Sequence, residues 1–135
     1  MEKAYICGMM EKTALITGAT SGIGEACARR FAEGGYRVII TGRNKERLEG
    51  LKSELEGQGR QVLTLLFDVR DRQAAHEAMD ALPLAWREID VLINNAGLAL
   101  GLEPEYEGAW DDWETMIDTN IKGLLTMTRI VVPQM

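Results

Sequence analysis

The sequence has little of the material from which metal sites and disulfide frameworks are built. Its 135 residues include two cysteines and one histidine, and Cys7, Cys27 and His76 stand far apart without metal-ligand spacing. We therefore predict no metal site, and we interpret the two thiols as incidental in a reducing compartment. His76 falls on a polar helical segment, which predicts a solvated side chain.

Long apolar runs and blocks of like charge are also absent. No apolar stretch approaches the ~20 residues that a membrane-spanning helix needs, and residues 1–10 lack the apolar segment of a signal peptide. The 21 acidic and 15 basic residues give a net charge of -6 and are mixed along the chain. These features argue against nucleic acid and membrane as partners, and we expect a cytoplasmic protein.

A glycine-rich turn at residues 17–24 is the most informative part of the sequence. It reads Thr-Gly-Ala-Thr-Ser-Gly-Ile-Gly, follows an apolar run and precedes residues with helical spacing. A strand, a glycine turn and a helix N-terminus in this order favour a phosphate-binding site, although an ordinary turn would also fit. Gly18 allows the tight turn, Gly22 lets a pyrophosphate approach the backbone, and Gly24 lets the helix pack against the strand.

Apolar and amphipathic segments alternate along the rest of the chain. The predicted strands span residues 13–17, 37–41, 62–67 and 90–93, and the predicted helices run from the glycine turn to Gly34-Gly35, from Lys45 to Glu56 after the cap Asn44, from Arg72 to Leu82, and onward from the cap Asp111 or Asp112. This alternation predicts an α/β fold, a Rossmann-like doubly wound parallel sheet. Residues 1–11 form a lead-in, and residues 12–135 form part of a dinucleotide-binding domain.

Polar and glycine residues follow each predicted strand. They are the glycine turn, residues 41–43, Asp68, and residues 94–97. The carboxyl ends of parallel strands share one edge of the sheet, where nucleotides bind. Four such features on one edge favour a nucleotide site.

The end of the second predicted strand indicates which nucleotide binds. NAD enzymes of this fold place a carboxylate about 20 residues after the glycine turn, where it would repel a 2′-phosphate. Here the strand ends in Thr41-Gly42-Arg43-Asn44, without an acid and with a guanidinium suited to phosphate. The predicted cofactor is NADP; the alternative is that Arg43 is a solvated surface charge.

With these motifs in this order and spacing, the chain resembles the short-chain dehydrogenases/reductases. The likeness rests on residues 17–24, Asp68, Asn94-Asn-Ala-Gly97 and Asn120, and it covers nearly the whole chain from Thr13 onward. Two longer segments, 89–101 and 112–120, look like those of NADP-dependent 3-hydroxy acid dehydrogenases, which oxidise serine or allo-threonine.

The resemblance implies a set of cofactor contacts. The glycine turn would hold the pyrophosphate, Asp68 with Val69 would meet the adenine, and residues 95–97 would line the ribose and support the central strand. Asp68 could instead cap the next helix, and the asparagines could form only a turn. The predicted cofactor-binding residues are Gly18, Thr20, Ser21, Gly22, Ile23, Gly24, Arg43, Asn44, Asp68, Val69, Asn95, Ala96 and Gly97.

Asn120 is the predicted catalytic residue. Its amide lies midway along an apolar helix, where it must find partners or cost roughly 1–3 kcal/mol. In the family the equivalent residue bends the helix and holds a water of the proton relay. Asn120 is thus assigned by resemblance, and its need for partners follows from the helix itself.

The family's catalytic pair, a Tyr with a Lys four residues later, does not occur in this sequence. Tyr5, Tyr36 and Tyr106 have Met, Ile and Trp at that offset. By the family's topology the strand order would be 3-2-1-4, and we interpret the chain as a truncated half that is inactive alone. Its uncovered fourth strand and its broadly apolar last helix predict a homo-oligomer through the C-terminal helix.

Three functions remain open at this point. The first is an oxidoreductase that transfers a hydride between NADP(H) and a small hydroxy acid or related carbonyl, once the missing half is supplied. The second is a non-catalytic nucleotide-binding module, and the third is a structural remnant that binds nothing. NADPH binding separates the third from the others, and activity with an added C-terminal half separates the first from the second.

Overall fold

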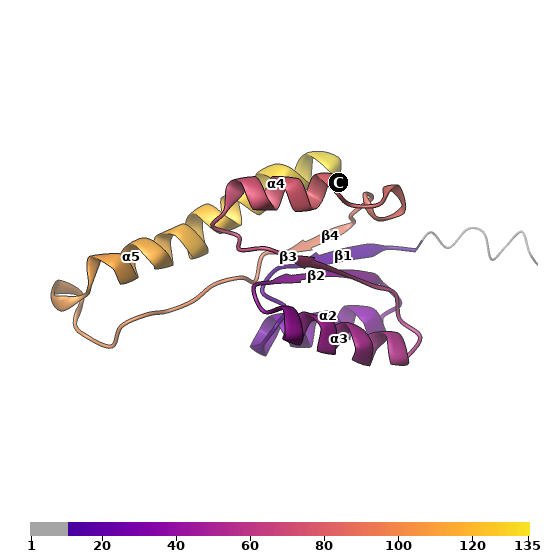
Figure 1. Ribbon diagram of the computed structural model, residues 1–135, viewed down its shortest axis with the longest axis horizontal. Helices are drawn as coiled ribbons and strands as arrows, with labels where there is room; N and C mark the ends of the chain where they lie inside the picture. Colours follow the sequence, from indigo (N-terminus) through magenta and orange to yellow (C-terminus); the bar gives the residue numbers. More distant parts are fainter. Residues whose placement is uncertain (1–10) are drawn as a thin grey trace, which may run out of the picture.

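A computed structural model describes residues 11–135, in which strands and helices alternate as predicted (Figure 1). The strands are β1 (Thr13–Ile16), β2 (Arg37–Gly42), β3 (Val62–Leu66) and β4 (Val91–Ile93). The helices are α2 (Gly22–Glu33), α3 (Lys45–Gly57), α4 (Arg72–Asp80), α5 (Trp110–Ile117), the π-helical η3 (Asp118–Gly123) and α6 (Leu124–Val131), with short 3-10 turns η1 (Leu84–Trp86), η2 (Glu105–Glu107) and η4 (Val132–Gln134). The predicted lead-in, with Tyr5 and Cys7, lies outside the described residues except for Glu11.

The four strands form one parallel sheet in the order β3-β2-β1-β4, which confirms the predicted topology. Ile16 of β1 pairs with Ile40 of β2 on one side and with Ile93 of β4 on the other. The chain therefore winds outward from β1 to β3 and then returns to place β4 beside β1. This reversal creates a switch point between β1 and β4, where α/β sheets bind their ligands.

Helices cover both faces of the sheet. In Figure 1, α2 and α3 lie below the sheet, and α4 and α6 lie above it. Side chains alternate along a strand. Ile16 therefore packs in the core between the sheet and helices α2 and α3, whereas Leu15 packs in the core between the sheet and helices α4 and α6. Burial on both faces explains why the strands read as nearly continuous apolar runs.

The last helix begins earlier than predicted. Neither Asp111 nor Asp112 is its N-cap, because α5 starts at Trp110 after the extended residue Ala109. The two carboxylates lie instead inside the first turn, where they still interact favourably with the helix dipole. Trp110 and Trp113 pack edge to face with ring centroids 5.0 Å apart, and this contact draws Trp110 into the helix.

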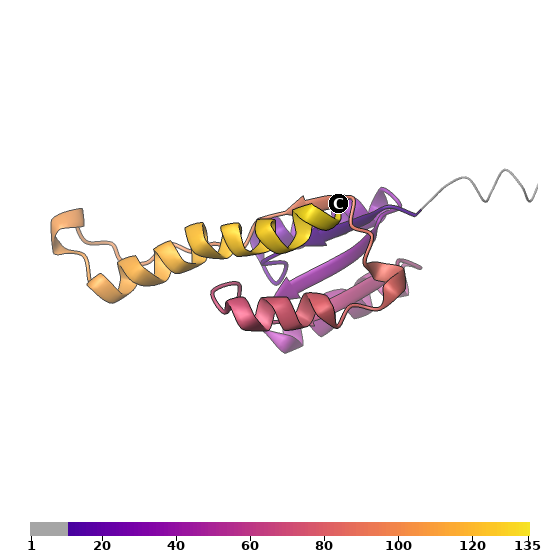
Figure 2. The ribbon, with the colours of Figure 1, turned by 90° about the horizontal axis from the view of Figure 1, so that it is seen from above.

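The segments α5, η3 and α6 follow one another as a single long helical rod. Figure 2, seen from above, shows α6 lying over the sheet and α5 extending well beyond it. Met127 and Val131 are fully buried against the sheet, whereas Leu124 and Leu125 are 42% and 58% exposed. Apolar surface on this helix is thus uncovered, as the sequence indicated. Within residues 11–135, none of the helices combines the length and apolar character needed to cross a membrane.

Candidate functional site

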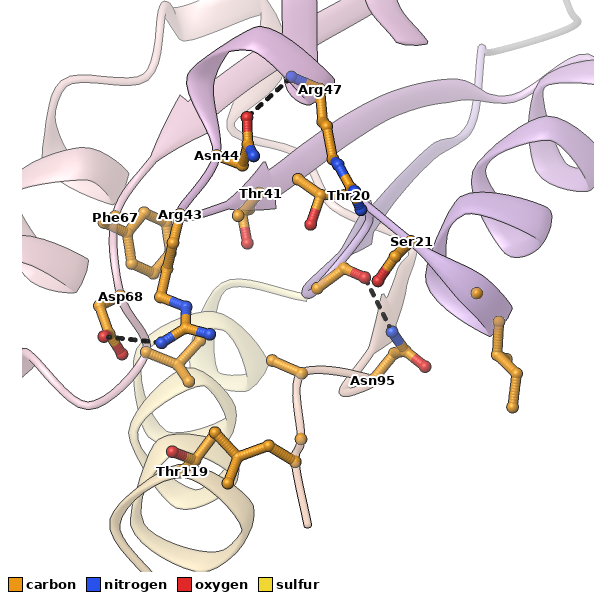
Figure 3. Close-up of a pocket in the computed structure, with 18 of the residues that line it drawn as sticks. Thr20, Ser21, Thr41, Arg43, Asn44, Arg47, Phe67, Asp68, Asn95 and Thr119 are labelled. Atoms are coloured by element: carbon orange, nitrogen blue, oxygen red, sulfur yellow. Dashed lines mark hydrogen bonds and ion pairs between the residues drawn. The ribbon is translucent and has the colours of Figure 1, made fainter. Parts of the chain in front are cut away.

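A cleft of about 1030 Å³ opens at the carboxyl ends of the strands. Its walls come from the glycine turn, the junction of β2 with α3, the residues after β3, and the loop after β4 (Figure 3). Twelve of the thirteen predicted cofactor-binding residues line it, the exception being Gly24. The lining residues are Gly18, Thr20, Ser21, Gly22, Ile23, Thr41, Gly42, Arg43, Asn44, Lys45, Glu46, Arg47, Phe67, Asp68, Val69, Asn95, Ala96, Gly97, Leu98 and Thr119.

The glycines of the turn have separate geometric roles. Gly18 and Gly22 adopt positive φ angles of 63° and 55°, which favour glycine. A Cβ on Gly24 would lie 2.2 Å from the Gly18 carbonyl oxygen, so only glycine lets α2 pack this close. A Cβ on Gly22 would meet nothing within 4 Å. Gly24 therefore allows α2 to pack closely against the glycine turn, whereas Gly22 keeps the cleft side of the turn free of a side chain.

Thr17 and Asn95 join the two loops at the switch point. The Thr17 hydroxyl oxygen accepts hydrogen bonds from the backbone N–H groups of Asn95 and Ala96, both at 3.0 Å. The Asn95 Nδ2 group donates to the backbone oxygens of Thr17 and Gly18 at 3.1 and 3.0 Å. The amide donors of Asn95 are thus used to hold the glycine turn against the end of β4.

The junction of β2 and α3 forms the basic side of the cleft. A Cβ on Gly42 would lie 2.5 Å from Thr20 Cγ2, so a side chain at this position would require the Thr20 side chain to move. Arg43 is largely exposed, with its Nη1 atom 3.9 Å from Asp68 Oδ2. Asn44 caps α3 as predicted, because its Oδ1 atom accepts from the Arg47 N–H at 3.1 Å.

Asp68 lies beside Arg43 and is held by Arg70 (Figure 3). Its Oδ2 atom accepts from Arg70 Nη2 at 2.7 Å, and its Oδ1 atom accepts from the Arg70 N–H at 2.9 Å. Burial acts to raise the Asp68 pKa, but the Arg70 hydrogen bonds and the charge of Arg43 outweigh it, so the pKa lies below its usual range. Asp68 is therefore an ionised acceptor at neutral pH. The alternative that it caps the next helix is wrong, because Asp71 caps α4.

Asn120 finds its hydrogen-bond partners in the loop after β4. Its Nδ2 group donates to the Leu98 oxygen at 2.8 Å, and its Oδ1 atom accepts from the Leu98 N–H at 2.9 Å. Asn120 lies in the π-helical η3, a rare element that is frequent at functional sites. Leu98 and Thr119 line the cleft, but Asn120 itself does not. Its side chain therefore holds the loop that forms the wall.

The sequence reasoning missed several residues of the cleft. Thr41 and Thr119 are buried hydroxyl residues of its lining, and Arg47 enters it from the first turn of α3. Thr41 was placed on the nucleotide edge with residues 41–43 but was not named as a cofactor contact, and Thr119 carried no signal that separates it from its helical neighbours. Arg47 could have been predicted as a cleft residue, because it lies four residues after Arg43, in the first turn of the helix that Asn44 caps.

A parallel sheet with order β3-β2-β1-β4 and a glycine turn at its switch point defines a Rossmann-type nucleotide-binding domain. Residues 12–135 match the family described as short chain dehydrogenase. The chain belongs to this family.

Curated proteins of this family are similar to the chain over most of its length. It is 61% identical over 121 residues to an NADP-dependent 3-hydroxy acid dehydrogenase, YdfG, of Salmonella typhi, covering 90% of this chain and 48% of that protein. It is 52% identical over 124 residues to a serine 3-dehydrogenase of Agrobacterium fabrum, covering 92% and 49%. The chain thus spans about half the length of the curated relatives it matches.

Solved structures agree with this likeness. The crystal structure of serine dehydrogenase from Escherichia coli matches with a TM-score of 0.85 and 53% identity, covering 91% of this chain and 56% of that one. A closed form of serine dehydrogenase complexed with NADP+ matches with a TM-score of 0.86 and 53% identity, covering 91% and 48%.

The junction at the switch point leads to a prediction on stability. Asn95→Ala leaves the backbone oxygens of Thr17 and Gly18 without their donor, so we expect a loss of about 1–3 kcal/mol in unfolding free energy. Gln58→Ala is the matched control, because this exposed amide at the end of α3 should change stability by less than about 0.5 kcal/mol. Urea unfolding followed by circular dichroism measures both. Equal losses in the two variants would contradict the assigned role.

Proposed function

We propose that the cleft binds NADP(H) and that the chain supplies the cofactor-binding part of an oxidoreductase. The reaction is hydride transfer between the cofactor and a small hydroxy acid or related carbonyl. The observation that carries the proposal is the end of β2, where Gly42 replaces the acid expected for NAD and Arg43 provides a cation at the cleft. Two of the relatives support it: one is named as NADP-dependent, and one is a serine dehydrogenase complexed with NADP+.

The residues of the cleft fit this cofactor. Gly22 leaves room beside the start of α2, and its N-cap, Ser21, makes no side-chain hydrogen bond to the first turn. The N–H groups of that turn suit a pyrophosphate. Thr41 Oγ1 is buried without a partner among the described residues, and buried polar atoms are normally paired. A polar ligand atom in the cleft would satisfy it.

The chain's own residues bind and orient in this proposal. When bound, NADP supplies the hydride chemistry at its nicotinamide ring. The glycine turn holds the pyrophosphate, Arg43 pairs with the 2′-phosphate, and the ionised Asp68 accepts from the adenine amino group. Both amide atoms of Asn120 are already bonded to Leu98. We therefore propose Asn120 as a positioning residue for the cleft wall.

A second candidate function is nucleotide binding without catalysis. It is favoured by one observation, namely that no tyrosine of this sequence has a lysine four residues later. Adding the C-terminal half of a family member separates the two functions. Dehydrogenase activity in the mixture supports the oxidoreductase, whereas cofactor binding without activity supports the binding module.

The cofactor assignment predicts tighter binding of NADPH than of NADH. Arg43→Ala should weaken NADPH binding by about 1.5–3 kcal/mol, the usual range for a hydrogen bond to a charged group, and should leave NADH binding unchanged. Arg72→Ala removes an exposed arginine from α4, outside the cleft lining, and is the control. Titration calorimetry measures the affinities of the unaltered chain and of both variants for each cofactor. Equal affinity of the unaltered chain for both cofactors would refute the assignment.

The absence of the Tyr and Lys pair predicts that the 135-residue chain alone has no turnover. General acid–base catalysis needs a titratable group within hydrogen-bond reach of the reacting hydroxyl. We expect no NADPH formation above the buffer blank with serine, allo-threonine or other 3-hydroxy acids at high protein concentration. Turnover that persists in Asn120→Ala would show that a different group performs the chemistry.

We also propose that the chain forms a homo-oligomer through its C-terminal helix. Exposed apolar side chains at Ile121, Leu124 and Leu125 support this, because their burial stabilises by about 25 cal/mol per Å². Leu124→Glu should lower the mass measured by light scattering at micromolar concentration. Leu102→Glu, the same change on the loop before α5, should not. A monomeric unaltered chain would exclude the association.

A further inference from the structure

Two arginines reach the basic side of the cleft from different directions. Figure 3 shows the Arg43 side chain running toward Asp68, and the Arg47 side chain running from α3 toward Thr20 and Ser21 of the glycine turn. In this view, Thr41 and Thr20 lie between the two guanidinium groups. The cap hydrogen bond from the Arg47 N–H to Asn44 fixes the turn from which Arg47 projects.

The two arginines differ in how far their charge is already offset. Arg43 has Asp68 Oδ2 3.9 Å from its Nη1 atom. Among residues 11–135, no carboxylate forms an ion pair with Arg47. Arg47 and Lys45 are therefore the cations of the cleft lining without a carboxylate partner among these residues, and Arg47 is the one whose planar guanidinium suits a phosphate.

Two acids that border Arg47 on its other side are bound by another arginine. On its far side Arg47 borders a smaller hollow that is also lined by Glu25, Arg29 and Glu54. Arg29 pairs with both carboxylates, at 2.8 Å to Glu54 Oε2 and at 2.5 Å to Glu25 Oε1. The cluster of one arginine and two carboxylates keeps one negative charge, yet neither carboxylate forms an ion pair with Arg47, which also lines the open cleft.

The space between the two arginines suits a small dianion. Gly42 contributes no side chain there, and Thr41, which is 1% exposed, has a hydroxyl without a partner within the described part of the chain. A phosphate monoester carries about −1.5 to −2 charges near neutral pH, because its second pKa is about 6. Arg43, partly offset by Asp68, balances less than one of these charges. A second cation is needed to balance the rest.

We propose that Arg47 is a second phosphate-binding residue, which contacts the 2′-phosphate of NADP(H) from the side opposite Arg43. This inference rests on the proposed function and extends it to a residue that carries specificity. The two guanidinium groups then enclose the phosphate, and the preference for NADPH over NADH depends on both. NADH has no 2′-phosphate, so its affinity is independent of Arg47.

The test measures the dissociation constants of NADPH and NADH for the full chain and its variants. Arg47→Ala should weaken NADPH binding by about tenfold or more, as expected for one charge-assisted contact, and should change NADH binding by less than about twofold. Arg47→Lys, which keeps the charge but loses the planar fork, should give a smaller loss. The double variant with Arg43→Ala should bind NADPH and NADH equally well.

Arg30→Ala, on the exposed side of α2, is the matched control and should leave both constants unchanged. The retained NADH affinity of Arg47→Ala reports that the variant is folded. If Arg43→Ala weakens NADPH binding but Arg47→Ala does not, the inference fails while the proposed function stands. If the unaltered chain shows no preference for NADPH, both fail.

Discussion

The hydrogen bonds between Thr17 and the Asn95-Ala96 segment are the interaction on which the cleft depends. They connect residues 78 and 79 positions apart in the sequence, at the point where the order of the parallel strands reverses. Thr17 is 1% exposed, so water does not compete for the hydrogen bonds that its hydroxyl accepts. Without these bonds the side-chain link between the glycine turn and the loop after β4 would be reduced to the Asn95 Nδ2 contacts with Thr17 and Gly18. With them, both walls of the cleft are fixed before any ligand arrives.

Two glycines allow close packing at the other walls of the cleft. Gly42 lets Thr20 pack against the end of β2, and Gly123 of η3 lets Val69 approach, since a Cβ there would lie 2.7 Å from Val69 Cγ2. Asn120 then ties the same helical segment to Leu98. The long helix therefore does more than cover the sheet. Its π-helical segment holds two separate loops of the cleft in place.

Much of the fold could be predicted from the sequence, because apolar runs, glycine turns and caps report local structure directly. The order of strands and the Asn44 cap are confirmed, whereas the start of α5 was predicted wrongly. The two aspartates carried the expected cap signal, but the contact between Trp110 and Trp113 extends the helix past them. The π-helical register of η3 leaves no comparable periodic signal. The roles of Arg47 and Thr41 depend on the directions of their side chains. The periodicity of a helix or strand in the sequence does not predict those directions.

The central claim is that the cleft at the switch point binds NADP(H), and backbone amide NMR tests it most directly. Titration with NADPH should shift the amide signals of residues 18–24, 41–47 and 95–97, which surround the cleft. Amides of residues 105–117, on the extended part of the last helix and the turn before it, should stay unchanged. Shifts confined to the last helix, or no shifts at saturating NADPH, would contradict the account.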